Sequence, residues 1–322
     1  MPTEPDELVA AGVSVAGIRF VRTPGSVAFD AIGTRWQIDS ERPITPDLLT
    51  GIARRIDEFD SVWSRFRADS TVTEIAAVGG SRDLGPDAPA LFSLYRRLGE
   101  ASGGGVSPLV GDALVALGYD ASYSFRQSGI PAPAPAVEDV AALNGTVLTV
   151  SRPVSIDVGA AGKGYLVDRV SELLLADGHT SFTVDASGDL LHSGPPIRIA
   201  LEHPFDPELA IGVLSFAGGA LAASATNRRA WGNGLHHVID GRTGEPVREV
   251  VATWATADDA ATADGAATAL FFTGPVALRA SLGPGGSGIA GADIAGRGIE
   301  GLRMFTDGSV EYSPGFSAEL FR

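Results

Sequence analysis

Along the first forty residues, apolar and polar side chains alternate with the period of two that is typical of β-strands. The alternation covers Gly17–Arg22 and Thr34–Ile38. These two runs predict a pair of strands that form a hairpin, joined through Ala28–Gly33. The chain is therefore expected to begin with an antiparallel element.

Further along, apolar residues recur every three or four positions, which is the period of a helix buried on one face. The clearest run follows Thr45, an N-cap residue with proline next to it, and predicts a helix to about Trp63. A second helix is expected over residues 86–101. Two more are expected, one directly after the glycine-rich turn at 159–164 and one over the alanine-rich segment Ala261–Phe272.

The remaining apolar runs are short and bounded by turn residues, so they predict strands. The expected strands are Thr146–Val150, Val154–Val158, Ser181–Asp185, Asp189–Leu191, Ile197–Leu201, Ile211–Phe216, Leu235–Ile239 and a closing hairpin of Leu302–Phe305 with Ser309–Tyr312. Helices and strands do not alternate one for one, and hairpins are expected at both ends of the chain. The pattern therefore favours an α+β fold with a mixed sheet over a parallel, doubly wound one.

We expect one domain over residues 1–322. Residues 1–16 are expected to form a flexible N-terminus, and residues 282–301 a glycine-rich loop. The alternating Pro/Ala segment at 131–135 predicts an extended surface segment and not a domain linker, because sequence rich in motifs lies on both sides.

Composition then narrows the class of protein. The 322 residues, 44% of them hydrophobic, are enough for a sizeable core. A formal net charge of −15 has the wrong sign for binding nucleic acid or anionic lipid. The lack of cysteine excludes disulfides, thiolate metal sites and cysteine nucleophiles. The sequence has neither a signal-peptide pattern at its start nor an apolar run of about 18 residues. We therefore expect a cytoplasmic protein without membrane insertion, although a chain trimmed of its leader would give the same pattern.

Lysine occurs once, at Lys163, in the segment Asp157-Val-Gly-Ala-Ala-Gly-Lys-Gly-Tyr165. A glycine turn that leads into a helix points free backbone N–H groups at one place where an anion can bind, and the lysine adds a charge suited to phosphate. The segment is not a Walker P-loop, because only two residues separate Gly159 from Gly162, and Gly164 stands where Ser or Thr would bind magnesium. The alternative is a tight turn with a solvated lysine.

Two other patterns carry candidate chemistry. Asp264 and Thr268 are four residues apart on the alanine-rich helix, so their oxygens share one face and suit Mg²⁺. Alternatively, Asp264 stabilises the helix dipole and Thr268 packs. His236 and His237 precede the turn at Asp240, and only one of the two can face a given pocket from a strand. That histidine could act as a base or cap the turn.

Two familiar signatures are poorly supported. The formal GxGxxG at residues 286–291 follows a glycine cluster and lacks the preceding strand of a dinucleotide fold. Ser/His/Asp hydrolysis lacks its Gly-x-Ser-x-Gly elbow between a strand and a helix.

Taken in order, these segments resemble the ApbE family of flavin transferases. The specific matches are the lysine turn Asp157–Asp168, His237-Val-Ile-Asp240-Gly-Arg-Thr-Gly244 and Ala263-Asp264-Gly-Ala-Ala-Thr268-Ala269. Supporting matches are Ile32-Gly33-Thr34, Ser64–Ser70, the segment from Gly104 to Asp120, and Val184–Asp189. The resemblance implies a T-fold-like architecture with flanking helices. It also implies that FAD and Mg²⁺ are used to attach FMN to a threonine of a target flavoprotein, within an acceptor pattern similar to Asp-x-x-x-Ser/Thr-Gly-Ala-Thr.

The resemblance further implies a role for each matching residue. Mg²⁺ would be held by Asp264, Thr268 and a carbonyl of the glycine turn, taken as that of Ala160. His237 would orient or deprotonate the acceptor hydroxyl, with Asp240 behind it. The residues expected to bind FAD are Ser64, Gly104, Asp157, Gly159, Lys163, Gly164, Asp168, Ser187, Gly188, Asp189 and His237, with Lys163 also acting in catalysis.

Five positions depart from the family pattern. Ser107 stands where the family often has Asp, Asp185 replaces Asn, Ser187 replaces Gly, Ala223 replaces Thr and Gly241 replaces Pro. Because these changes fall in the expected flavin pocket, three hypotheses stay open. The protein is an FMN transferase, an FAD pyrophosphatase that gives FMN and AMP, or a non-catalytic FAD-binding protein.

Overall fold

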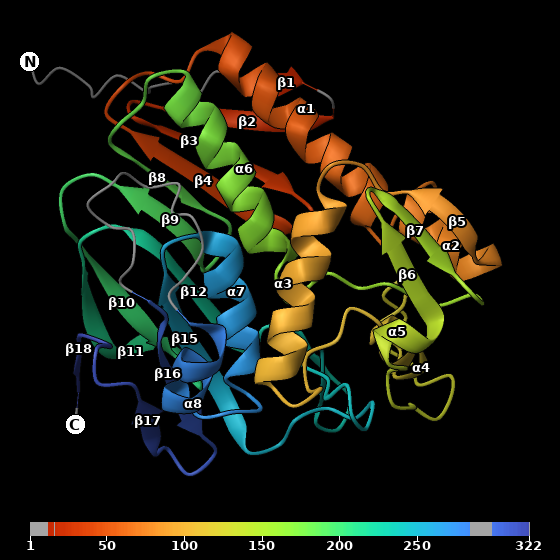
Figure 1. The fold of residues 1–322 in the computed structure, drawn as a ribbon. Coiled ribbons are helices and arrows are strands. Elements are labelled where there is room, and N and C mark those ends of the chain that lie inside the picture. Colours follow the sequence, from red (N-terminus) through yellow and green to blue (C-terminus); the bar gives the residue numbers. More distant parts are fainter. Residues whose placement is uncertain (1–11, 16, 284–297, 322) are drawn as a thin grey trace, which may run out of the picture.

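The computed structural model describes residues 12–15, 17–283 and 298–321 (Figure 1). Its main sheet is formed by ten strands: β1 (Gly12–Val15), β2 (Ile18–Thr23), β3 (Ser26–Ala31), β4 (Thr34–Ser40), β8 (Phe182–Asp185), β9 (Asp189–Ser193), β12 (Gly219–Ala225), β15 (Val250–Ala257), β16 (Glu300–Phe305) and β17 (Val310–Tyr312). These strands lie side by side in the same order in the sheet. Each neighbouring pair is antiparallel.

Three smaller sheets complete the strand inventory of the described residues. They are β10 (Ile197–His203) with β11 (Asp206–Phe216) and β18 (Ala318–Leu320), β5 (Gly80–Asp83) with β7 (Val147–Val150) and β6 (Ala141–Asn144), and β13 (Ala230–Trp231) with β14 (Leu235–His236). The α+β class is confirmed. The expected mixed sheet is not observed, because long excursions such as the one between β4 and β8 bring the chain back antiparallel to the strand it left.

The helices are α1 (Pro46–Trp63), α2 (Thr71–Val78), α3 (Ala88–Ala101), α4 (Gly111–Ala116), α5 (Val137–Val140), α6 (Gly162–Ala176), α7 (Ala260–Ala269) and α8 (Pro275–Leu282). Figure 1 shows α1, α6 and α7 along one face of the main sheet, with α3 packed against α7. The side chain of Thr45 accepts a hydrogen bond from the N–H of Leu48, as expected for the N-cap of α1.

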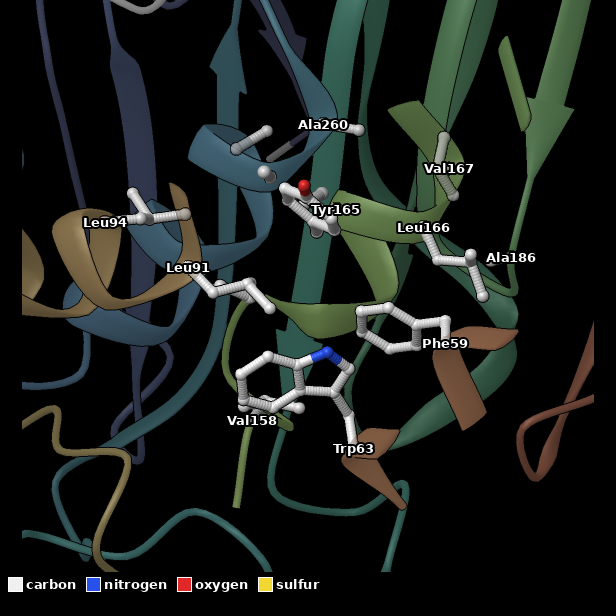
Figure 2. Close-up of a cluster of buried hydrophobic side chains, with 14 of the residues drawn as sticks. Phe59, Trp63, Leu91, Leu94, Val158, Tyr165, Leu166, Val167, Ala186 and Ala260 are labelled. Carbon is white, nitrogen blue, oxygen red and sulfur yellow. The ribbon is translucent and has the colours of Figure 1, made fainter. Parts of the chain in front are cut away.

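The largest hydrophobic core lies between these helices and the sheet. Figure 2 shows Phe59 and Trp63, at the end of α1, beside Tyr165 and Leu166 at the start of α6. The rings of Phe59 and Tyr165 are stacked with centroids 6.1 Å apart. Because Tyr165 is two residues beyond Lys163, this packing fixes the start of α6 against α1 and holds the glycine turn in place.

Four expectations for local structure were wrong. Residues 28–31, expected to connect a hairpin, belong to β3, which pairs with β2 and β4. The expected strand Val154–Val158 is not a strand, because the N–H of Asp157 bonds to the carbonyl of Pro108 and not to a strand ladder. The expected strand Leu235–Ile239 stops at His236, since the N–H of His237 donates to the carbonyl of Arg229.

The fourth expectation concerned the two segments predicted to be flexible or loop. Within residues 1–16, Gly12–Val15 form β1 and pair with β2, while residues 1–11 and 16 lie outside the described residues. Within residues 282–301, Leu282 ends α8 and β16 begins at Glu300. Residues 284–297, which include the GxGxxG match, also lie outside the described residues.

Candidate active site

A cavity of about 640 Å³ opens at the ends of α1, α6 and α7, within the size range of small-molecule sites. Its lining includes the predicted site residues Ser64, Asp157, Gly159, Ala160, Lys163, Ser187, Gly188, His237, Asp264 and Thr268. These residues are spread over about two-thirds of the chain. The fold therefore brings together the lysine turn, the histidine motif and the Asp/Thr pair in one place.

Lys163 lies between two buried carboxylates. Its ammonium group forms an ion pair with Asp189, and it is 3.9 Å from the nearer oxygen of Asp264. The Oδ1 atom of Asp189 is buried and has no hydrogen-bond partner among the described residues. The alternative interpretation of Lys163 as a solvated lysine is therefore wrong.

The glycine turn donates its N–H groups to protein acceptors, contrary to the prediction that they are free for an anion. The N–H of Gly159 bonds to Asp157 (2.7 Å), that of Ala160 to the hydroxyl of Tyr95 (3.2 Å), and that of Gly162 to the carbonyl of Val158 (2.7 Å). What the turn presents to the cavity is the carbonyl oxygen of Ala160. The turn is therefore better suited to a cation than to a phosphate.

The oxygens of the Asp/Thr pair meet this carbonyl. The hydroxyl of Thr268 donates to the carbonyl of Ala160 (3.3 Å), and one oxygen of Asp264 accepts the N–H of Gly164 (2.9 Å). Burial raises the pKa of Asp264, and the charge of Lys163 opposes that shift. Within the described ranges, no cluster of three or more His, Cys, Asp or Glu could hold a metal ion. The predicted set instead offers a carboxylate, a hydroxyl and a carbonyl, which are ligand types that Mg²⁺ prefers.

Gly164 fixes the distance between α6 and α7. A Cβ at this position would fall well inside contact distance of the carbonyl of Ala260 and 2.7 Å from the Cβ of Asp264. Gly164 was predicted to bind the cofactor, but it is buried and does not line the cavity. Its role in the structure is to allow the two helices to approach.

Four other predicted residues are also absent from the lining. Asp168 is buried, and its two oxygens accept the N–H groups of Ala260 and Ala261 at the start of α7 (2.8 and 2.9 Å). Asp189 acts through Lys163. Gly104 is exposed and does not line the cavity, and its carbonyl oxygen is 2.7 Å from where a Cβ of Gly241 would be. Asp168 and Asp189 therefore hold neighbouring parts of the lining in place, and contact of these residues with FAD stays a prediction.

The fourth is Asp240, which was expected to support His237. Its carboxylate instead pairs with Arg242 (2.6 Å) and accepts the N–H of the same residue (2.9 Å). It therefore stabilises the turn that follows His237 and has no hydrogen bond to the imidazole in the described part of the chain.

His237 lines the cavity, whereas His236 does not: its Nε2–H donates to the carbonyl of Val247 (2.9 Å), and its Nδ1 accepts the N–H of Val238. Burial lowers the pKa of His237 to about 3, with smaller contributions from Arg229, His236 and Lys163. Its Nδ1 has no hydrogen-bond partner among the described residues. His237 is therefore a neutral, half-buried imidazole whose Nδ1 is buried without a partner among the described residues.

Arg65 was not predicted as a site residue, although the segment Ser64–Ser70 contains it. Its guanidinium binds the carboxylate of Asp157 (2.5 Å) and the carbonyl of Tyr119 (2.7 Å). It also lies over the rings of Phe66 and Tyr119. Asp157, predicted to contact FAD, is thus neutralised by Arg65 on the cavity wall.

Three of the departures from the family pattern have a visible consequence in the structure. Ser187 lies in the left-handed region, with φ of 59°, and its hydroxyl donates to the carbonyl of Arg35 (2.9 Å). The N–H of Gly188 bonds to Asp185, whose pKa is raised by burial. At Gly241 a proline would lose the N–H bond to the carbonyl of Gly105 (2.9 Å). The chain therefore accommodates Ser187 under backbone strain and needs an N–H at position 241.

The structure contains no helix, within residues 12–15, 17–283 and 298–321, that is both long and apolar enough to cross a membrane. The chain is 28% identical, over 336 aligned positions, to a FAD:protein FMN transferase of Rhodobacter capsulatus; the match covers 97% of this chain and 62% of the relative. The chain thus spans less than two-thirds of that relative. A FAD:protein FMN transferase of Vibrio cholerae is 27% identical, over 70% of this chain and 73% of the relative.

Solved structures support the same fold. An ApbE protein from Thermotoga maritima superposes with a TM-score of 0.72 at 23% identity, covering 90% of this chain and 97% of that one. The flavin transferase ApbE from Vibrio cholerae gives 0.70 at 23% identity, covering 90% and 98%. The sequence profile of the ApbE family matches residues 32–285. The chain therefore belongs to the ApbE family.

Proposed function

We propose that this protein is a FAD:protein FMN transferase, which moves FMN from FAD to a threonine hydroxyl of a target flavoprotein and releases AMP in a Mg²⁺-dependent reaction. The observation that carries the proposal is the meeting of Lys163, His237 and the oxygens of Ala160, Asp264 and Thr268 in one cavity. The names of the curated relatives support it.

The residues that would hold Mg²⁺ are Asp264, Thr268 and, through its carbonyl, Ala160. When bound there, the ion would act as a Lewis acid on the diphosphate oxygens and stabilise the leaving phosphate. Lys163 is positioned to bind a diphosphate oxygen from the same side, since its ammonium group reaches both Asp189 and Asp264. The buried carboxylates keep this cation in a fixed place.

His237 is suited to receive the proton of the acceptor hydroxyl, because it is neutral and lines the cavity. In the proposed step the threonine oxygen forms a bond to the phosphorus on the FMN side. The bond from that phosphorus to the bridging oxygen breaks, and AMP leaves with this oxygen. The hydroxyl proton goes to the imidazole. A negatively charged diphosphate beside His237 would raise the pKa of the imidazole and so strengthen it as a base.

The test is to incubate the purified chain with FAD, Mg²⁺ and an acceptor domain that carries an Asp-x-x-x-Thr-Gly-Ala-Thr segment, and to measure acceptor mass and free AMP. The proposal predicts one FMN adduct for each AMP released. AMP without an adduct would show that water is the nucleophile and that the protein is an FAD pyrophosphatase. Bound FAD with neither product would show a non-catalytic flavin-binding protein.

A further inference from the structure

A second cavity, of about 360 Å³, adjoins the main one. One side is formed by the rings of Tyr119, Tyr123 and Phe125, and the other by residues 227–230. Most of the residues that line it, including Tyr123 and Arg229, also line the main cavity. The second cavity is therefore a side entrance that shares a wall with the proposed active site.

Arg229 differs from the other arginines of the main cavity. Arg65 pairs with Asp157, Arg67 with Asp57, Asp60 and Asp69, and Arg228 with Glu202. The guanidinium of Arg229 contacts the hydroxyl of Tyr119 (2.5 Å) and the carbonyl of Gly33 (3.5 Å), both neutral groups. No carboxylate of the described residues lies within ion-pair distance of it. This cation is therefore available for a carboxylate from outside the chain.

The same segment is tied to His237. The carbonyl of Arg229 accepts the N–H of His237 (3.2 Å), and the charge of Arg229 contributes to the lowered pKa of the imidazole. A group held by Arg229 is thus held beside the residue proposed to receive the acceptor proton.

The opposite wall of the second cavity is aromatic and accessible. Tyr123 and Phe125 are 43% and 46% exposed, and Tyr123 stacks on Phe66 with centroids 4.9 Å apart. Both residues have a positive φ, 51° and 50°. Such backbone strain clusters at ligand clamps, and exposed aromatic rings beside arginine are typical of protein interfaces. The wall is therefore suited to a peptide segment that packs against these rings.

We propose that the second cavity receives the acceptor segment of the target protein, and that Arg229 binds a carboxylate of that segment near the acceptor hydroxyl. This inference rests on the proposed function. The diphosphate of FAD is the other negatively charged group that could bind Arg229. We assign the diphosphate to Lys163 and to the metal held by the oxygens of Asp264 and Thr268, at the inner end of the main cavity.

The test uses a labelled synthetic peptide containing Asp-x-x-x-Thr-Gly-Ala-Thr, and a matched peptide with Asn in place of Asp. Peptide binding to the full chain is measured by fluorescence anisotropy, and FAD binding is measured separately by flavin fluorescence. Arg229→Gln should weaken binding of the Asp peptide about ten-fold and bring it close to the Asn peptide, since one charge-assisted bond is lost. Arg229→Lys should retain most of the discrimination between the two peptides.

Two matched variants complete the design. Arg228→Gln removes a neighbouring charge that is already neutralised by Glu202, and should have a smaller effect than Arg229→Gln. Arg96→Gln removes an exposed charge on α3, away from both cavities, and controls for the change in net charge. Circular dichroism of each variant confirms that it is folded before the binding data are compared.

Each outcome is informative. Equal losses of FAD and peptide affinity in Arg229→Gln would assign Arg229 to the dinucleotide and overturn the inference. Wild-type protein that does not bind the Asp peptide, or binds both peptides equally, would also overturn it. Peptide binding that depends on Arg229, without FMN transfer by the wild type, would support the docking site and reject the proposed transferase function.

Discussion

The two sides of the cavity are built in different ways. The inner wall, formed by Gly159–Gly164 and α7, is mostly buried, and its polar groups bond to one another. The rim, formed by residues 119–125 and 227–230, carries half-exposed aromatic rings and arginines whose contacts come from distant segments. In the inner wall, the packing of the backbone fixes the positions of the oxygens. At the rim, a few side-chain contacts fix the positions of the rings and the guanidinium groups.

This difference teaches how one cavity can combine exact positioning with partner recognition. Charged groups that act on a phosphate need a fixed geometry, which the close approach at Gly164 supplies. A surface that receives a segment of another protein needs accessible rings and a cation without a fixed partner, and these are found at the rim. Variants of the inner wall should therefore affect both stability and chemistry, whereas variants of the rim should affect recognition.

The largest effect is expected at Asp264. Asp264→Ala removes the proposed metal carboxylate, so FMN transfer should fall about 100-fold or more and lose its dependence on Mg²⁺. Transfer is measured by acceptor mass over a range of Mg²⁺ concentrations. Asp264→Asn is the matched control, because it can still accept the N–H of Gly164 but lacks the charge, and it should be equally inactive but more stable than Asp264→Ala. Unchanged Mg²⁺-dependent transfer in both variants would contradict the metal assignment.

Gly164→Ala should be the most destabilising change in the inner wall. Its methyl group would collide with the backbone of Ala260, so the free energy of unfolding should fall by about 1–3 kcal/mol. Gly51→Ala is a matched control in α1, where a Cβ meets no atom within 4 Å. The free energy of unfolding of Gly51→Ala should be about 0.5–1 kcal/mol higher than that of the wild type, because alanine favours a helix. Urea unfolding measures both; similar effects at the two positions would contradict the packing role of Gly164.

The third prediction concerns pH. The pKa of His237 is about 3 in the folded protein, below the value of 6.5 for an unperturbed histidine. Between these two values the unfolded chain binds a proton that the folded chain does not, so stability falls as pH falls from about 6.5 towards 3. His237→Gln should remove a contribution of roughly 1.4 kcal/mol per pH unit within that window. Parallel curves of unfolding free energy against pH for the two proteins would show that His237 is not the group responsible.

The smallest effect is expected at Ser187, which also lines the cavity. Ser187→Gly relieves the positive φ but loses the bond to the carbonyl of Arg35, so the net change should stay within about 1 kcal/mol. Ser187→Ala loses the bond and retains the strain, and should be the less stable of the two. Thermal unfolding of the pair compares them directly. A more stable alanine variant would mean that the backbone at this position is not strained.

How far the sequence could predict the fold depended on how local the signal was. The capping threonine and the apolar period before Trp63 predicted α1, because both signals lie within the helix itself. In contrast, β12 consists of small residues without alternation, and it is a strand because β9 and β15 pair with it on both sides. The same reason explains β3, whose Asp30 and following Gly33 favour a turn when only local sequence is considered.

The candidate site shows the same limit. Residue types and spacing marked Lys163 and the pair Asp264 and Thr268 as separate candidates, the resemblance to the ApbE family implied that they act together, and the structure brings them to one cavity. The hydrogen-bond partners of the site residues could not be predicted, because they depend on which distant groups the fold brings close. The carboxylate of Asp168 accepts N–H groups at the start of α7, and the turn amides are used internally, neither of which the sequence indicated. The residues next to Arg229 in the sequence did not indicate a role for it, because its contacts with Tyr119 and Gly33 come from distant parts of the chain.

The most direct test of the central claim is the position of a divalent cation in crystals of the wild-type protein soaked with FAD and Mn²⁺. An anomalous difference map should show one peak bounded by the carboxylate of Asp264, the hydroxyl of Thr268 and the carbonyl of Ala160, next to the diphosphate. A map with ordered FAD and the cation bound elsewhere, or with the diphosphate far from Lys163, would contradict it.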